Sequence, residues 1–310
     1  MNKKRKHITF GKPFVGKEEL DILAKVIKSK WIGTGPITQN FEEKFKKYKE
    51  SKYAISVNSC TAAIHLSLIT LGIKKGDEVI TTPMTFASTI NAIVLVGAKP
   101  ILADINDKTF NIDPKNIEKK ITKKTKAILI VHLAGLPCEV NKIKKIAKKN
   151  SLYLLEDCAH SIESKYNNRH TGTLGDMGCF SFYSTKNLTT AEGGMILCKK
   201  IKQSDRLKVL RLHGLARDAW QRYLPKKSKN NSKFNHYDVK EIGFKYNLTD
   251  LNSALGLAQL KKIDRNWLER KKIFQFYKEK LSDLPLDFQN FKTDVSKFKH
   301  AYHLCIIRLK

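Results

Sequence analysis

Short apolar stretches alternate with segments of helical spacing between residues 53 and 198, and this alternation limits the possible folds more than any other feature of the chain. Because strands that alternate with helices form parallel sheets, the pattern predicts an α/β domain with a mostly parallel central sheet and helices on both faces. The expected strands are Tyr53–Val57, Glu78–Thr82, Lys99–Asp104, Ala127–His132, Leu152–Glu156, Cys179–Tyr183 and Met195–Cys198. The expected helices between them are Ala62–Leu71, Phe86–Val96, Ile117–Ile121 and Val140–Asn150.

The pattern changes on both sides of this region. Helical spacing occurs before it and again, in longer runs, after Ile201; the expected helices are Glu18–Ser29, Ile37–Tyr48, Ser204–Leu212 and Leu248–Glu279. The polar segment Lys226–Tyr237 is expected to be a mobile loop. The chain stops inside an expected strand, His303–Leu309, with no partner segment after it. We therefore expect residues 1–245 to form a large domain, and residues 246–310 to form a linking helix and the start of an incomplete small C-terminal α+β domain.

The chain carries a formal net charge of +30, from 59 Lys and Arg against 29 Asp and Glu. Such a charge suits nucleic acid, and a salt-dependent gel shift would favour that alternative. The basic residues follow ordinary amphipathic periodicity, however, and no nucleic-acid motif accompanies them. We therefore expect a solvated surface whose field attracts an anionic substrate, and no nucleic-acid partner.

Six cysteines occur without any CxxC pair, which argues against a disulfide framework. Cys158 and His160 could bind a metal, but no second ligand pair has the required spacing, so we expect none. No apolar segment is long enough to cross a bilayer, and none follows Met1 as a secretion signal would. These features predict a cytoplasmic protein without membrane insertion.

Lys186 follows a run of aromatic and hydroxyl residues that reads as the end of a buried strand. Burial lowers the pKa of a lysine and frees the neutral amine to form a Schiff base, although a lysine that reaches from a buried stem to the surface is the alternative. About 30 residues earlier, an apolar strand ends in Asp157, which could instead be a helix N-cap. Pyridoxal phosphate requires this pairing of a Schiff-base lysine and a carboxylate for its pyridinium nitrogen.

A phosphate site is expected where the strand ending at Val57 is followed by Ser59, Cys60 and Thr61 at the start of a helix. A plain N-cap explains the same residues. Taken singly, His160 reads as a core histidine and Phe86 as a core aromatic residue. Glycines 172, 175 and 178 lack the dinucleotide-binding spacing.

Together these residues resemble the DegT/DnrJ/EryC1/StrS family of sugar aminotransferases. The resemblance rests on the chain order Thr61, Phe86, Asp157, His160, Ser184, Lys186, and on the stretch Cys179 to Asn187 above all. It runs from about Phe14 to the last residue. It implies a fold-type I, pyridoxal-phosphate-dependent transferase of the aspartate aminotransferase type.

The resemblance also implies a role for each site residue. Lys186 would bind the cofactor covalently and carry the proton, and Asp157 would pair with the pyridinium nitrogen. The remaining implied cofactor contacts are Phe86 on the ring face, His160 near the 3-oxygen, Cys60, Thr61 and Ser184 at the phosphate, and Asn247 at the phosphate from the second subunit of a homodimer with a shared active site. Gly33, Thr34 and His303 would line the sugar–nucleotide cleft.

The implied reaction moves an amino group from L-glutamate, which leaves as 2-oxoglutarate, to the 4-keto carbon of a nucleotide-linked sugar, for surface polysaccharide or lipopolysaccharide. Motifs around Arg211, Tyr246 and His300 look most like the branch that makes UDP-4-amino-4-deoxy-L-arabinose. Branches acting on other 4-keto-6-deoxyhexoses or on 3-keto sugars stay open, as does a relative that does not transaminate, although Lys186 argues against the last. Family members continue past the His303 strand, so we expect this chain to be truncated at its C-terminus.

Overall fold

The computed structural model of the protein describes residues 9–215, 238–290 and 297–310, so the polar segment Lys226–Tyr237 lies outside the described residues. The helices of this part are α1 Lys17–Lys28, α2 Pro36–Tyr48, α3 Cys60–Thr70, α4 Ala87–Leu95, α5 Pro114–Lys119, α6 Val140–Lys149, α7 Ile201–Leu210, α8 Asp250–Lys261 and α9 Ile263–Lys280. The strands are β1 Tyr53–Val57, β2 Glu78–Thr81, β3 Lys99–Leu102, β4 Thr125–Val131, β5 Tyr153–Asp157, β6 Lys165–Tyr166, β7 Arg169–His170, β8 Met177–Ser181, β9 Gly194–Cys198, β10 Leu286–Phe288, β11 Phe298–Lys299 and β12 Ile307–Leu309.

The described chain is organised around a seven-stranded sheet in the order β1-β9-β8-β5-β4-β2-β3. Neighbours from β8 to β3 pair in parallel, and β9 runs antiparallel to both β8 and β1. The expected mostly parallel α/β sheet is therefore confirmed. Because β1, β2, β4, β5 and β8 all point the same way, their carboxyl ends meet at one edge, where ligands of open α/β sheets bind.

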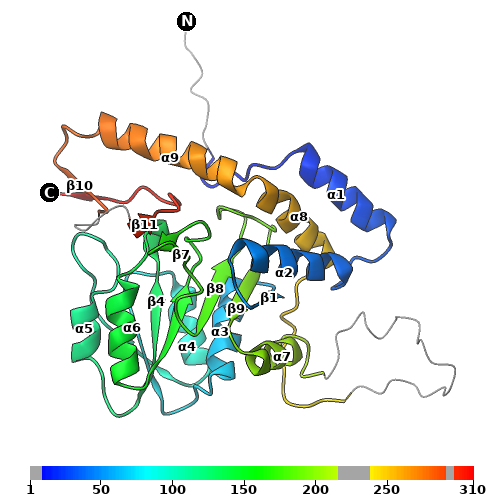
Figure 1. Ribbon diagram of the computed structural model, residues 1–310, viewed down its shortest axis with the longest axis horizontal. Coiled ribbons are helices and arrows are strands. Elements are labelled where there is room, and N and C mark those ends of the chain that lie inside the picture. The colour runs from blue at the N-terminus through cyan, green and yellow to red at the C-terminus, as the bar shows by residue number, and fades with distance from the viewer. Residues whose placement is uncertain (1–8, 216–237, 291–296) are drawn as a thin grey trace, which may run out of the picture.

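Helices cover both faces of this sheet (Figure 1). Alternate side chains of β4 show why: Ala127 and Leu129 pack with α3, α4 and α7, whereas Ile128 and Ile130 pack with α5 and α6. The second face continues under α2 and α8. There, buried phenylalanines meet edge to face, at centroid distances of 5.2 to 6.1 Å. Each such pair adds about 0.5–1.5 kcal/mol beyond the apolar area that it buries.

The expected single helix over Leu248–Glu279 is wrong, because two helices, α8 and α9, meet at Lys262. Lys262 is buried, and its ammonium pairs with Glu19 of α1 at 2.6 Å. Since a buried ammonium needs a carboxylate partner, this contact fixes the direction of the chain where α8 ends. A charged residue inside a helical pattern gives no sign of such a distant partner.

The expected terminal strand His303–Leu309 is wrong in its extent. Only β12, Ile307–Leu309, is a strand, and it pairs antiparallel with the earlier strand β10. The backbone N–H of His303 instead donates to the carbonyl of Ala134 at 3.1 Å. This contact draws the segment before β12 toward the carboxyl edge of the main sheet.

Candidate active site

The turn between β1 and α3 places a helix N-terminus at the carboxyl edge of the sheet. The Ser59 hydroxyl caps α3 by accepting a hydrogen bond from the Ala62 N–H at 3.1 Å. Cys60 and Thr61 are the next residues, and the first N–H groups of a helix have no partner within it. Gly194 at the start of β9 lies so close that a Cβ there would stand 2.6 Å from the Ser59 carbonyl. This tight turn offers N–H groups and the positive end of a helix dipole to an anion.

Asp157 ends β5 beside this turn, and its side chain is buried. Its Oδ2 accepts a hydrogen bond from the Thr89 hydroxyl at 2.9 Å, and its Oδ1 accepts one from the Ala159 N–H at 3.0 Å. The Cys60 thiol lies 3.9 Å from Oδ1. Burial raises the pKa of Asp157, whereas the Ala159 and Thr89 hydrogen bonds and the charge of Lys186 act against that rise. A buried carboxylate of this kind favours a cation at its side.

Lys186 lies in the turn that follows β8 and is half-buried. Its backbone N–H donates to the carbonyl of Tyr183 at 2.9 Å, which closes the turn. Burial lowers the pKa of the Lys186 ammonium, and the nearby Asp157 and Cys60 oppose that lowering only in part. A larger neutral fraction makes the amine a nucleophile and a base near neutral pH.

Lys186, Ser184 and His303 line one cavity of about 640 Å³. Lys12, Arg265 and Arg270 are also part of its wall; the remaining lining residues are Gly11, Pro13, Phe14, Thr185, Asn187, Thr189, Gln259, Asn266, Glu269 and Ile273. Basic side chains therefore outnumber acidic ones around the reactive amine. Such a wall favours an anionic ligand.

Two histidines lie against each other beside this cavity. The rings of His160 and His303 stack, with centroids 4.4 Å apart and an interplanar angle of 27°. Burial and the charge of Lys186 lower the pKa of His160 to about 3. Burial also lowers the pKa of His303 well below its ordinary value. Both rings are therefore neutral near pH 7.

The described lining of the Lys186 cavity does not include Phe86, Gly33, Thr34 or Asn247. Phe86 is the N-cap of α4, and 78% of its side chain is exposed. Asn247 donates from Nδ2 to the Thr34 hydroxyl at 2.6 Å, and the carbonyl of Gly33 accepts from the N–H of Asp250 at 2.9 Å. Among the described residues, no hydrogen bond joins this second group to Asp157 or Lys186.

Three polar residues near the site escaped the sequence reasoning. The Thr89 hydroxyl donates a hydrogen bond to Asp157. The Asn187 side chain forms one hydrogen bond with Glu163 and another with His303. Asn187 directly follows Lys186, so its place in the motif was a usable signal. Thr89 and Glu163 carry no signal, because a helix interior and a polar turn both accommodate such residues without a functional reason.

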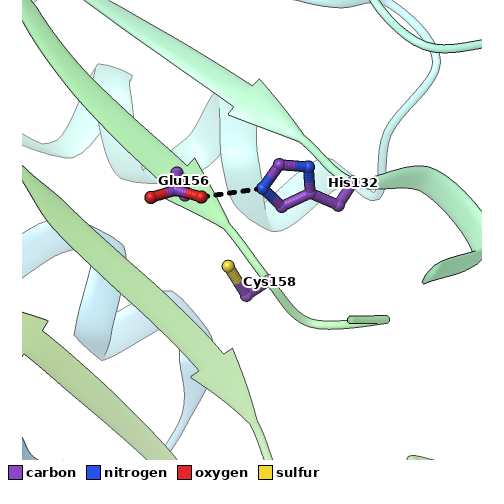
Figure 2. Close-up of side chains that lie close together, drawn as sticks. All are labelled: His132, Glu156 and Cys158. Carbon is purple, nitrogen blue, oxygen red and sulfur yellow. Dashed lines mark hydrogen bonds and ion pairs between the residues drawn. The ribbon is translucent and has the colours of Figure 1, made fainter. Parts of the chain in front are cut away.

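His132, Glu156 and Cys158 bring three possible metal-ligand atoms within 4.8 Å of one another (Figure 2). The atoms already have other roles. Glu156 accepts from His132 Nε2 at 3.0 Å and from backbone N–H groups of the turn 172–175, and His132 Nδ1 accepts from the Cys138 N–H. Burial and the charge of Glu156 raise the pKa of the Cys158 thiol. The cluster therefore functions as a hydrogen-bonded anchor for that turn.

Comparison with known proteins identifies the chain's relatives. The model of the DegT/DnrJ/EryC1/StrS aminotransferase family matches residues 13–310. The spore coat polysaccharide biosynthesis protein SpsC of Bacillus subtilis is 41% identical over 310 residues, which are 100% of this chain and 78% of that protein.

Two solved structures illustrate the likeness in fold. The putative sugar aminotransferase Spr1654 of Streptococcus pneumoniae in its PMP-form has a TM-score of 0.90 at 30% identity, covering 98% of this chain and 79% of that one. Its PLP-form matches with a TM-score of 0.87. Helicobacter pylori PseC, an aminotransferase involved in pseudoaminic acid biosynthesis, has a TM-score of 0.86 at 32% identity, covering 98% of this chain and 78% of that one. In the described part of this chain, no helix is both long and apolar enough to cross a membrane.

Proposed function

The chain belongs to the DegT/DnrJ/EryC1/StrS aminotransferase family, and from this premise we propose that it moves an amino group from L-glutamate to the 4-keto carbon of a nucleotide-linked sugar. The family and the matched structures make it a sugar aminotransferase with the fold-type I architecture. Its cofactor is pyridoxal phosphate, as in the PLP- and PMP-forms of the matched structure. One observation supports the reaction best: burial lowers the pKa of Lys186, and the charge of Lys186 acts against the rise that burial causes in the pKa of Asp157.

The residues at the carboxyl edge fit this cofactor. Asp157 is a buried carboxylate suited to a pyridinium N–H, and the Cys60–Thr61 helix start and Ser184 are suited to a phosphate. Lys186 would supply the amine that binds the cofactor aldehyde. His160 accepts from the Ala134 N–H at its Nδ1, which leaves an Nε2–H to donate to the 3-oxygen. We propose that Phe86 lies on the face of the cofactor ring, because the exposed phenyl ring of Phe86 is available to be covered by a ligand.

The chain's own residues account for the movement of the proton. When bound, the cofactor supplies the electron sink that stabilises negative charge on the carbon bearing the transferred nitrogen. Lys186 Nζ, with its lowered pKa, accepts the proton from that carbon of glutamate and returns a proton in the opposite half of the reaction. Asp157 would pair with the pyridinium N–H, and Thr89 and Ala159 hold its carboxylate in place. The cavity wall holds the substrate while this exchange takes place.

The basic residues of the cavity support the proposal that the sugar is linked to a nucleotide. A sugar bound to a nucleoside diphosphate carries phosphate anions, and Lys12, Arg265 and Arg270 line the cavity that contains Lys186. We propose that Gly33, Thr34 and His303 also contact the sugar nucleotide. Residues 1–245 would bind the cofactor, and residues 246–310 would close the cleft with His303.

We further propose a homodimer in which Asn247 reaches the phosphate of the partner's site. The Oδ1 atom of Asn247 is buried and has no hydrogen-bond partner among the described residues. A phosphate oxygen accepts hydrogen bonds, so the donor to it would be the Nδ2 group of Asn247, which gives one hydrogen to the Thr34 hydroxyl and carries a second. The active site is then shared between two subunits.

A substrate panel tests the proposed function. The holoenzyme with glutamate would be assayed against UDP-, dTDP- and GDP-linked 4-keto sugars, 4-keto-6-deoxyhexoses and 3-keto sugars. We expect transfer to a 4-keto sugar, with UDP-4-keto-arabinose preferred and the product used for surface polysaccharide or lipopolysaccharide. Preference for a 6-deoxyhexose or a 3-keto sugar would assign another branch. Failure of every nucleotide sugar would overturn the proposal.

A further inference from the structure

Asn187 connects a buried carboxylate to a histidine of the cavity. Its Nδ2 lies 2.8 Å from Glu163 Oε2, and its Oδ1 lies 2.8 Å from His303 Nδ1. Glu163 is fully buried and forms an ion pair with Arg270 of α9. An ionised carboxylate can only accept hydrogen bonds. Glu163 therefore dictates which end of the Asn187 amide faces it.

This contact fixes the tautomer of His303. Because Glu163 needs a donor, the Asn187 NH₂ group faces it and the amide oxygen faces the imidazole. The carbonyl of Ala301, 3.4 Å from the same Nδ2, requires the same orientation. The amide oxygen can only accept, so His303 donates from Nδ1–H. A neutral His303 then carries its free lone pair on Nε2.

The surroundings keep His303 neutral. Burial is the largest influence, and the charges of Lys186 and Arg270 act in the same direction on its pKa. No described hydrogen bond engages Nε2, and this atom is absent from the buried, unpartnered polar atoms of the described chain. His303 lines the cavity together with Lys186. Its free lone pair is therefore available to a ligand.

The stacked partner has the opposite tautomer. The N–H of Ala134 donates to His160 Nδ1 at 3.3 Å, so the hydrogen of neutral His160 is on Nε2. Two parallel rings, 4.4 Å apart, thus offer one donor and one acceptor. A neighbour fixes each tautomer. The Ala134 N–H can only donate to His160, and the Asn187 amide oxygen can only accept from His303.

We propose that Asn187, oriented by Glu163, is a positioning residue that makes His303 a hydrogen-bond acceptor for a hydroxyl group of the sugar substrate. This inference rests on the proposed function and adds a substrate requirement to it. The sugar must present a hydroxyl hydrogen to Nε2 of His303 in the cavity. The ammonium of the amino donor offers similar chemistry, and the two half-reactions distinguish these sources.

The first test needs neither cofactor nor substrate. The wild-type chain, labelled with ¹⁵N at histidine, is studied by NMR at neutral pH, and the His303 signals are identified from their loss in His303→Gln. We expect the pattern of a neutral ring with hydrogen on Nδ1. A hydrogen on Nε2, or a doubly protonated ring, would overturn the inference. This readout remains valid even if the chain turns over no nucleotide sugar, so its failure is separate from failure of the proposed function.

The second test uses Asn187→Leu in the holoenzyme, which removes the amide that fixes the His303 tautomer. We expect kcat/KM of the sugar half-reaction to fall about tenfold, because the hydrogen bond to the sugar hydroxyl is lost, while the glutamate half-reaction keeps its rate. Asn40→Leu, at an exposed position on α2, makes the same change of side chain and should leave both half-reactions unchanged. An unchanged sugar half-reaction in Asn187→Leu, or a loss only with glutamate, would overturn the assignment.

Discussion

The hydroxyl of Thr89 donates a 2.9 Å hydrogen bond to Oδ2 of Asp157, and both side chains are buried. Thr89 lies on α4 and Asp157 at the end of β5, so the bond joins a helix to the sheet at the point where the pyridinium is expected. The bond favours the charged form of a carboxylate that burial disfavours. Thr89 therefore supports the cofactor site although it is expected to contact no substrate.

We predict that Thr89→Val weakens binding of pyridoxal phosphate about tenfold or more, since a hydrogen bond to a charged group contributes about 1.5–3 kcal/mol. Valine keeps the shape of threonine and removes only the hydroxyl. Fluorescence titration of the cofactor-free chain measures the affinity. Thr89→Ser keeps the donor and should bind nearly as tightly as wild type. Equal affinities of the valine, serine and wild-type chains would show that the bond is unimportant.

A shared active site predicts complementation between two defective chains. Lys186→Ala removes the reactive amine, and Asn247→Ala removes the proposed contact to the partner's phosphate. In a mixed dimer one site combines both defects and the other contains neither, so activity should rise when the two variants are refolded together. Transaminase assays of the mixture and of each variant alone measure this rise. No gain in a mixture shown to contain heterodimers would place Asn247 in its own subunit's site.

The ion pair between Arg211 and Glu42 predicts a large effect on stability. Arg211 is buried, and its guanidinium lies 2.5 Å from a Glu42 oxygen that also accepts from the Ser56 N–H and hydroxyl. Arg211→Met leaves that carboxylate buried without its cation, so the free energy of unfolding should fall by about 3–5 kcal/mol. Urea unfolding measures the loss. Adding Glu42→Gln should restore much of it, and purely additive effects would count against a coupled pair.

Stability should fall in acid because of His170. Burial and the charges of Lys49, Lys165 and Lys299 lower the pKa of His170 to about 2. Below its ordinary pKa of 6.5 the unfolded chain binds a proton that the folded chain refuses, so this contribution is complete above pH 6.5 and is lost as the pH falls. It amounts to about 2 kcal/mol by pH 5.

The variant His170→Phe keeps a ring near Tyr48 and removes the titrating group. Unfolding by urea at several pH values between 8 and 5 gives the slope of stability against pH. The slope should be shallower in the variant than in wild type, whatever the offset at pH 8. Parallel slopes would mean that His170 titrates normally in the folded chain.

The sheet could be predicted from the sequence because most of its strands, with the edge strand β3 as an exception, are buried on both faces. Parallel strands of this kind read as short apolar runs, and the expected bounds of Tyr53–Val57 match β1. The expected strand Cys179–Tyr183 begins at Met177 instead, since β8 pairs with β9 from that residue on. Such shifts depend on neighbours that local periodicity does not contain.

The C-terminal region was harder to predict because distant contacts shape it. The break at Lys262 depends on Glu19, and the path of His303 depends on the carbonyl of Ala134. Lys186 and Asp157 could be selected as candidates from their motifs, since Asp157 ends an apolar strand and Lys186 comes shortly after another. The orientation of the Asn187 amide could not be predicted from the sequence, because it depends on Glu163 and His303, which lie 24 and 116 residues away along the chain.

The most direct measurement is to identify the lysine that binds pyridoxal phosphate. The purified chain with added cofactor is reduced with borohydride, digested and analysed by mass spectrometry. We predict that the reduced cofactor is attached to Nζ of Lys186, and that Lys186→Ala shows neither the attachment nor turnover. Stable attachment at another lysine of the wild-type chain, or none at all, would contradict the role of Lys186.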